Sequence, residues 1–287
     1  MKYAINTNCL MEQFSTIDIV RMAGKLGFDG IEWGLPEKDY KQAAKDMVKA
    51  SSDYGLKIAG FLNAGHLWKE NLMRSYSEAV AGTGAGYLRV TAPWVAFNYD
   101  ESLHQKQSFN ELFAICRNGL DKLVELGSEY GIKYVIETHM GGLCASPVIG
   151  KMLLDGLDPN HVGLLYDPGN GVVEGFIRPR LAIEIMGSYL ASIHAKNLRH
   201  VWTGLIRKDG PVRAGWSYEI SLLDSGYVDW AEMMFAAKVC NFNGWISMEE
   251  FFKPEPEKML KDGLDFLKQC EKESPSGPQS PFSTFND

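Results

Sequence analysis

The sequence has few cysteines, and their arrangement indicates neither a disulfide framework nor a zinc knuckle. The five cysteines are scattered along the chain and form no C-x-x-C pair. This pattern favours reduced thiols, as found in the cytosol. The start of the chain lacks the apolar core of a secretory signal, and no window is apolar over a membrane-spanning length. We therefore expect a cytoplasmic protein that does not cross a membrane.

The chain also lacks an excess of basic residues. Its 29 lysines and arginines are outnumbered by 36 aspartates and glutamates, which gives a formal net charge of −7 at pH 7. This balance argues against non-specific binding to nucleic acid or to an anionic membrane surface. No G-x-G-x-x-G or G-x-x-x-x-G-K-[ST] motif follows an early predicted strand. A nucleotide-binding open sheet, the alternative to a barrel, is therefore weakly supported.

Short apolar strands alternate with segments of helical periodicity along most of the chain. With 45% hydrophobic residues the chain can bury a sizeable core. Eight strands are predicted, at residues 3–9, 28–33, 56–62, 87–91, 132–138, 162–166, 189–195 and 245–248. They are rich in β-branched residues, mostly do not alternate with polar ones, and are separated by helices, which is typical of a parallel sheet. Eight such units predict a single-domain (β/α)₈ TIM barrel.

Two segments fall outside this rhythm. Residues 198–227 are predicted to be irregular, and a stretch of this length suggests a lid or a subunit contact. Residues 271–287 are rich in Ser, Pro and Gly and have no periodicity. We therefore predict a barrel over residues 1–270, followed by a polar tail at 271–287.

Four consecutive late strands end in a potential metal ligand, namely Glu137, Asp167, His194 and Glu249. In a barrel the carboxyl ends of all strands lie on one face, where barrel enzymes have their active sites. Three carboxylates and one imidazole suit Mn²⁺, Mg²⁺ or Co²⁺, and Zn²⁺ also accepts these ligands. The alternative is that each residue only caps a loop. Four in a row make that the weaker explanation, because carboxylates so close together repel each other without a cation.

Side chains two residues apart in a strand point the same way. His139 therefore shares a face with Glu137, where it is expected to contact substrate or act as an alternative base. A supporting or core imidazole is the competing interpretation. Lys196 shares a face with His194 in the same manner and could hold a substrate oxygen, although a solvated lysine is equally consistent with the sequence.

Two earlier strands also contribute candidates at the same rim. His66 follows the third predicted strand and could line a substrate pocket, and Glu32 ends the second, where it could bind a hydroxyl or support the pocket. Arg89 lies within the fourth strand and is expected to pair with an acid inside the barrel.

Six short stretches carry a family resemblance through their order and spacing, namely GFDGIE (27–32), IETH (136–139), YDPGN (166–170), HAKN (194–197), GYVDW (226–230) and WISME (245–249). The chain resembles the xylose isomerase-like barrel superfamily, in particular its sugar (phosphate) isomerase/epimerase branch, from its start to about residue 270. The resemblance implies that Glu137, Asp167, His194 and Glu249 bind one divalent metal. It also implies that Glu137 and Glu249 shuttle protons on opposite faces of a ketose.

One position departs from the family pattern. Asn170 stands where members commonly have a histidine three residues after the aspartate. The related AP endonucleases use extra histidines to build a multi-metal site, so a single metal is expected here, most readily Mn²⁺. Together with the acidic charge, this argues against a nuclease.

These observations predict a divalent-metal-dependent sugar isomerase or epimerase. It would abstract a proton α to a carbonyl and pass through a metal-stabilised enediolate. The alternative is a lyase on the same scaffold, like inosose or dehydroshikimate dehydratase, and cleavage of 3-keto glycosides is a further outcome of similar chemistry. A non-catalytic sugar-binding module would not need four ionisable groups around a metal. We expect a small sugar or polyol as substrate, and the family implies a homo-oligomer, dimer or tetramer.

Overall fold

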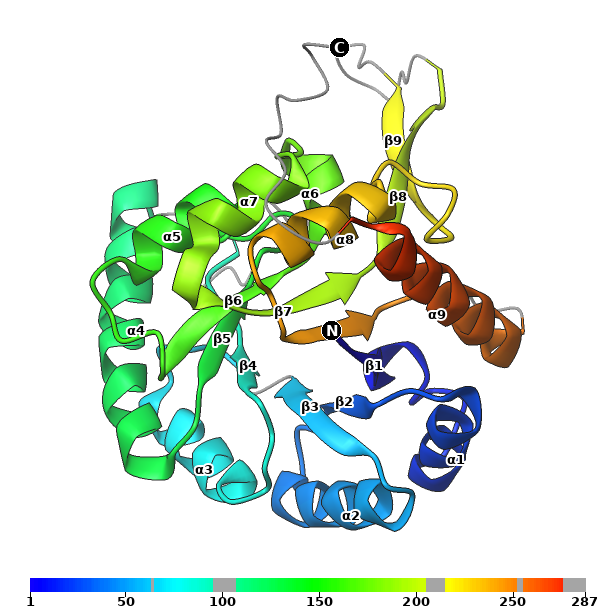
Figure 1. Ribbon diagram of the computed structural model, residues 1–287. Coiled ribbons are helices and arrows are strands. Elements are labelled where there is room, and N and C mark those ends of the chain that lie inside the picture. Colours follow the sequence, from blue (N-terminus) through cyan, green and yellow to red (C-terminus); the bar gives the residue numbers. More distant parts are fainter. Residues whose placement is uncertain (63–64, 95–106, 205–214, 252–254, 276–287) are drawn as a thin grey trace.

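The apolar runs of the sequence form eight parallel strands that close into one barrel (Figure 1). The computed structural model describes residues 1–62, 65–94, 107–204, 215–251 and 255–275. The strands are β1 (Lys2–Asn6), β2 (Gly30–Gly34), β3 (Lys57–Leu62), β4 (Leu88–Val90), β5 (Tyr134–Glu137), β6 (Val162–Tyr166), β7 (Leu190–Ala195) and β10 (Trp245–Met248). Around the barrel they follow the order β1-β10-β7-β6-β5-β4-β3-β2. The predicted (β/α)₈ barrel is confirmed.

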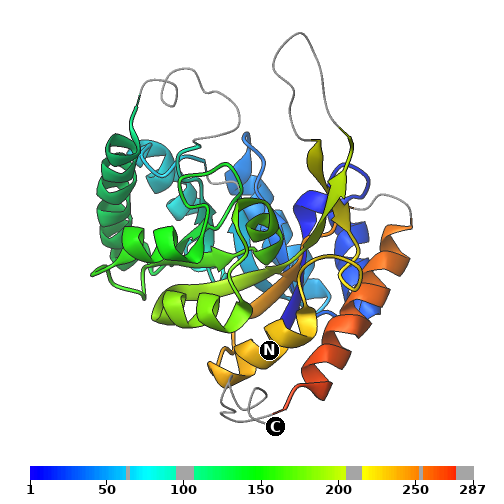
Figure 2. The ribbon, with the colours of Figure 1, turned by 90° about the horizontal axis from the view of Figure 1, so that it is seen from above.

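Helices follow the strands and pack around the outside of the barrel (Figures 1 and 2). They are α1 (Thr16–Leu26), α2 (Tyr40–Asp53), α3 (Glu70–Val80), α4 (Phe109–Tyr130), α5 (Pro147–Leu154), α6 (Pro168–Glu174), α7 (Pro179–Met186), α8 (Trp230–Val239) and α9 (Pro256–Glu273). Local signals set their ends. Ser15 caps α1 by accepting a hydrogen bond from the N–H of Asp18, and Gly27 ends it at a φ of 82°.

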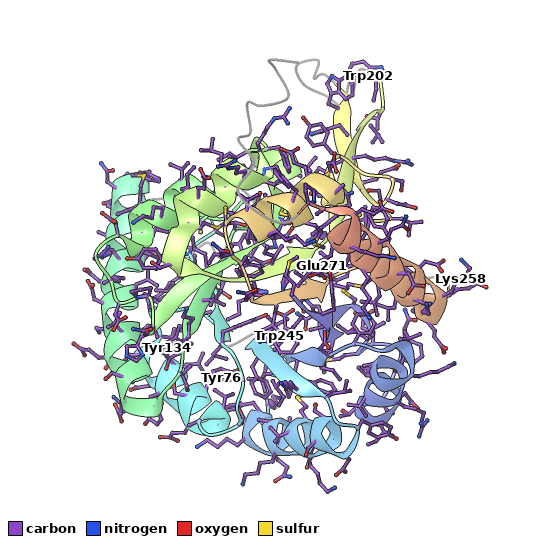
Figure 3. The ribbon with its side chains drawn as sticks, viewed as in Figure 1. Tyr76, Tyr134, Trp202, Trp245, Lys258 and Glu271 are labelled. Carbon is purple, nitrogen blue, oxygen red and sulfur yellow. The ribbon has the colours of Figure 1, made fainter. Side chains whose placement is uncertain are left out.

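A small apolar cluster fills the inside of the barrel. Its members come from strands on all sides or from the residues beside them: Ala4, Ala59, Leu62, Tyr87, Val135, Leu165 and Trp245. Trp245 lies near the middle of the ring of strands in Figure 3. Gly60 leaves the space that the Tyr87 ring occupies, because a Cβ at Gly60 would lie 2.2 Å from Tyr87 Cε2. This packing fixes the strands, and with them the side chains at their carboxyl ends.

Two predicted strands end earlier than expected. The first, predicted at residues 3–9, ends at Asn6, and a 3₁₀ turn at Thr7–Cys9 follows because the Asn6 side chain accepts a hydrogen bond from the N–H of Asn8. The fifth, predicted at 132–138, ends at Glu137. The prediction that Glu137 and His139 share a face assumed that both residues lie in one strand. This assumption was wrong, because His139 lies in the turn after the strand.

Residues 198–227 were predicted to be irregular. Residues 205–214 lie outside the described residues, and in the described part of this stretch the prediction was wrong. Strands β8 (Asn197–Trp202) and β9 (Trp216–Ser221) pair in an antiparallel hairpin that projects away from the barrel (Figures 1 and 2). Each strand alternates between two faces, and one face carries the pair Trp202 and Trp216, whose ring centroids lie 5.2 Å apart. The hairpin stands outside the barrel, so its strands lack the continuous apolar runs of the barrel strands.

Several other expectations concern the ends and surface of the chain. The last helix, predicted at residues 255–270, is α9 and continues to Glu273, while residues 276–287 of the predicted tail lie outside the described residues. The division into a barrel and a tail therefore stays a prediction.

All five cysteines are free thiols. Among the described helices, none is both long and apolar enough to span a lipid bilayer.

Candidate metal centre

The four predicted ligands meet at one point at the carboxyl ends of neighbouring strands. Glu137 ends β5, Asp167 and Glu249 directly follow β6 and β10, and His194 lies in β7; these four strands are adjacent in the barrel. One ligand atom from each lies within 4.8 Å of the others, and all four residues are buried. Two ligands on opposite sides of one cation are about 4 to 4.6 Å apart at usual metal–ligand distances. The cluster could therefore hold a metal ion.

Both ring nitrogens of His194 face carboxylates. Nε2 lies 2.9 Å from Glu32 Oε2, while Nδ1 lies 3.2 Å from Glu137 Oε1 and 3.4 Å from Glu249 Oε2. Glu32 thus binds the side of the ring that points away from the other ligands. When Nε2–H donates to Glu32, Nδ1 carries a free electron pair that points toward the centre of the cluster. A carboxylate behind a histidine in this way is a common support for a metal-binding imidazole.

Glu32 is itself held from the barrel interior. The hydroxyl of Tyr87 donates to Glu32 Oε1 and also lies 3.1 Å from Ser192 Oγ. Because Gly60 makes room for the Tyr87 ring, the packing inside the barrel and the orientation of His194 are connected. The sequence predicted that Glu32 binds a hydroxyl or supports the pocket, and this role stays a prediction.

Asp167 is fixed by a set of short contacts at the start of α6. Its Oδ1 accepts a hydrogen bond from the backbone N–H of Asn170 at 3.0 Å. Its Oδ2 accepts hydrogen bonds from Asn170 Nδ2 at 2.6 Å and from Lys196 Nζ at 3.3 Å. Lys196 Nζ also lies 3.1 Å from Glu249 Oε2. Lys196 is 5% exposed, so it is part of the cluster and not a solvated lysine.

The two glutamates are each held by a further side chain. Arg89 lies 3.0 Å from Glu137 Oε2, which confirms the predicted pairing of this arginine with an acid inside the barrel. Asn6 Nδ2 donates to Glu249 Oε1 at 3.0 Å. Burial raises the pKa of Glu137, but the charges of Arg89 and His194 outweigh it and lower that pKa to about 2. Glu137 is therefore ionised at neutral pH.

The other pKa values describe a cluster crowded with negative charge. Burial raises the pKa of Asp167 to about 7, against the opposing effect of Lys196. Burial lowers the pKa of His194, but the carboxylates of Glu32 and Glu249 raise it well above its usual range. Burial likewise opposes ionisation of Glu249, and Lys196 and His194 lower its pKa well below the usual value. Protons thus take up part of the negative charge when no metal does.

A divalent cation fits the charge of the site. The four carboxylates of Glu32, Glu137, Asp167 and Glu249 face two permanent cations, Arg89 and Lys196. With a neutral His194 this leaves two negative charges, which one divalent cation would neutralise. The donor set of three carboxylate oxygens and one imidazole nitrogen is also the kind that hard divalent metals accept.

The remaining predicted residues lie farther out at the rim. His139 is half-buried, its ring meets Trp94 edge to face at 4.6 Å, and with Glu137 and Arg89 it lines a small cavity. His66 follows β3 and stacks on Trp68, with ring centroids 4.5 Å apart. The roles of His139 and His66 in substrate binding stay predictions.

Sequence reasoning missed three residues that hold the cluster together, namely Asn6, Tyr87 and Asn170. Asn6 ends β1, the same strand-end signal that identified the four ligands, so it could have been found. Asn170 was noted only as a departure from the family pattern. Tyr87 precedes β4, and nothing in its neighbourhood in the sequence indicates that its hydroxyl reaches Glu32.

Known proteins resemble this chain over nearly its whole length. It is 22% identical over 285 residues to an inosose dehydratase from Geobacillus kaustophilus, an alignment that covers 90% of this chain and 89% of that protein. Its fold matches 3-keto-D-glucoside 4-epimerase from E. coli with a TM-score of 0.71 and 16% identity, covering 94% of this chain and 100% of that one.

A third similar protein carries a metal. The fold matches the IOLI protein, whose structure contains a zinc atom, with a TM-score of 0.72 and 16% identity, covering 94% of this chain and 96% of that one. The family model described as the xylose isomerase-like TIM barrel matches residues 20–270. The protein therefore belongs to the xylose isomerase-like TIM barrel family.

Proposed function

We propose that this protein is a metal-dependent isomerase or epimerase that removes a proton next to the carbonyl of a keto sugar or keto polyol. The observation that carries the proposal is the convergence of Glu137, Asp167, His194 and Glu249 within 4.8 Å in a buried cluster. We assign these four residues as the metal ligands. A bound divalent cation supplies charge that stabilises an enediolate.

The two glutamates are the proposed acid and base. Glu137 and Glu249 reach the cluster from β5 and β10, with β6 and β7 between them, so they stand on different sides of the site. One removes the proton from the substrate carbon, and the other returns a proton to it or to its neighbour. Lys196, His139 and His66 are assigned to substrate oxygens, and Glu32 keeps His194 oriented.

A second candidate function is elimination of water from a keto polyol. It is favoured by the inosose dehydratase that aligns over 90% of this chain. Elimination needs a base on one carbon and an acid at the leaving hydroxyl, whereas epimerisation needs a proton acceptor and a donor on opposite faces.

Incubation of the Mn²⁺-loaded protein with a panel of ketohexoses, 3-keto glucosides and inososes in deuterated water tests both proposals. Deuterium entering one carbon with no loss of water supports isomerisation or epimerisation, and an enone absorbance supports elimination. Substrate binding without either result contradicts both.

We expect Glu249→Gln to lower turnover by about a hundredfold or more, because it removes a proton acceptor at the reacting carbon. Glu137→Gln should do the same. The matched control is Glu78→Gln on the surface helix α3, which should keep full turnover. If Glu137→Gln with metal bound turns over at the wild-type rate, its assignment as acid or base is wrong.

The preference for Mn²⁺, the homo-oligomer and the cytoplasmic location stay predictions from the sequence.

A further inference from the structure

A second cavity lies outside the barrel, between α9 and the loop that follows β9. Its volume is about 270 Å³. Leu223, Met259 and Phe266 give it apolar walls, and Asp224 and Asp262 are among its acidic residues. Figure 3 places Lys258, which also lines the cavity, on the outer side of α9. None of the four residues of the metal cluster lines this cavity.

A buried carboxylate without a full set of partners lines this cavity. Glu250 follows Glu249 in sequence, but it lines the cavity between α9 and the loop, outside the metal cluster. It is 4% exposed, and its Oε2 has no hydrogen-bond partner among the residues that the structure describes. A backbone hydrogen bond from Leu223 reaches the carboxylate. An ionised carboxylate oxygen in such a place lacks a compensating charge, and a protonated one lacks an acceptor, so either form costs free energy.

The helix facing Glu250 keeps space for this oxygen. Gly263 lies within α9, and a Cβ there would come within 3.1 Å of Glu250 Oε2 and 2.5 Å of Met248 Cε. Glycine inside a helix is less favourable than alanine. The close approach of Glu250 and Met248 accounts for a glycine at this position.

The charge of the cavity selects a cation as its ligand. Four carboxylates line it against one lysine, and that lysine, Lys258, is paired with Asp262 and has 69% of its side chain exposed. A metal ion is a poor match, because in the described part of the chain Glu250 does not belong to any group of three or more close metal-binding side chains. An amine on an aliphatic chain suits both the carboxylates and the apolar walls.

We propose that this cavity binds a small aliphatic amine, with one ammonium group on the Glu250 carboxylate and its carbon chain against Leu223, Met259 and Phe266. A diamine places its second ammonium group at the rim, near Asp224 and Asp262. The ammonium supplies the donors and the charge that Glu250 lacks, and the chain covers apolar surface.

Calorimetric titration of the Mn²⁺-loaded protein with putrescine (1,4-diaminobutane) at constant ionic strength tests this proposal. We expect saturable binding, and we expect Glu250→Gln to weaken it by about tenfold or more, because the neutral amide cannot pair with an ammonium. Glu257→Gln is the matched control, since Glu257 is on α9 but outside the cavity and pairs with Lys25. It should bind putrescine as the wild type does.

Butane-1,4-diol, which has the same length and no charge, should not bind. Equal affinities of the wild type and Glu250→Gln, equal heats for the diol and the diamine, or no binding of putrescine up to about 10 mM each overturn the proposal. Should Glu250→Gln fail to fold, a crystal structure of the wild type soaked in putrescine decides the question. Density for the diamine beside Glu250 supports the site, and density only elsewhere overturns it.

Discussion

At the scale of single residues, the most informative contact is that between Glu32 and His194. Glu32 Oε2 lies 2.9 Å from Nε2 on the far side of the ring from the other three predicted ligands. Such carboxylates fix the ring and its protonation, and their loss typically lowers metal affinity by about ten- to a hundredfold. The orientation of His194 therefore depends on a residue that does not belong to the group of four predicted ligands.

Glu32→Gln is expected to weaken Mn²⁺ binding by about ten- to a hundredfold, because the amide can present its oxygen to Nε2–H but without the charge that supports the imidazole. Competition with a fluorescent chelator measures the affinity. Glu78→Gln on α3 is the control and should leave it unchanged. An unchanged affinity in Glu32→Gln would mean that Glu32 does not support the metal-binding state of His194.

Asp167 gives a pH-dependent prediction. Burial raises its pKa to about 7 in the metal-free fold, above about 3.9 in the unfolded chain. The folded state binds this proton more tightly than the unfolded chain does. Ionisation of Asp167 therefore destabilises the metal-free protein as the pH rises from about 4 to about 7. Asp167→Asn removes this loss.

The melting temperature of metal-free Asp167→Asn should therefore exceed that of the metal-free wild type by about 2 to 5 °C at pH 8, and the difference should shrink toward pH 4. Thermal melts in the presence of chelator across this range provide the test. A difference that stays constant with pH would show that Asp167 ionises normally in the fold.

At the scale of secondary structure elements, the ends of strands and helices decide where the ligands lie. Asp167 follows β6 and is also the N-cap of α6, accepting the N–H of Asn170 at 3.0 Å. The sequence shows the Asp-Pro pair typical of a helix start, yet α6 is only seven residues long. A helix this short has too few residues to show a periodic apolar face, so it was not predicted.

Gly60 in β3 links the barrel packing to the metal cluster. A Cβ at Gly60 would lie 2.2 Å from Tyr87 Cε2, so Gly60→Ala must displace the ring that holds Glu32. We expect a loss of about 1 to 3 kcal/mol in the free energy of unfolding, together with weaker metal binding. Urea denaturation and the chelator assay measure the two effects.

Gly24→Ala is the control for that experiment. Gly24 lies within α1, and its added Cβ would be 3.8 Å from the nearest atom, Tyr54 Cδ1. This change should leave metal binding intact and stabilise the fold slightly, because alanine favours a helix. Similar stabilities of Gly60→Ala and the wild type would show that Tyr87 can move without cost.

At the scale of the whole molecule, the barrel concentrates four carboxylates that are far apart in the sequence. Arg89 and Lys196 balance two of them, and protons on His194 and Asp167 take up charge in the metal-free protein. A divalent cation replaces these protons, so its binding should be coupled to both pH and folding stability.

Removal of the metal by a chelator is therefore expected to lower the melting temperature. Mn²⁺ at a hundred times its dissociation constant stabilises the folded state by about 2.7 kcal/mol, which corresponds to roughly 5 to 10 °C for a chain of this size. Asp167→Asn, which lacks one ligand, should show a much smaller response to Mn²⁺. Equal responses of the variant and the wild type would place the metal elsewhere.

The sequence by itself determined the barrel and the four clustered residues at the carboxyl ends of its strands. Strands such as 162–166 are apolar throughout, and a polar residue directly after such a strand lies at the rim of the barrel. This reasoning needs only residues that are adjacent in the sequence. It identified Glu137 and Glu249 in the same way, because each ends a mostly apolar run.

Only the tertiary structure decided which side chains orient these four. Tyr87 reaches Glu32, and Asn6 reaches Glu249 across 243 positions of sequence, because the closed barrel brings β1 next to β10. The β8–β9 hairpin also depends on pairing between strands separated in sequence. Hydrogen bonds between distant residues depend on strand register and on the space inside the barrel, and no local pattern of residues encodes either.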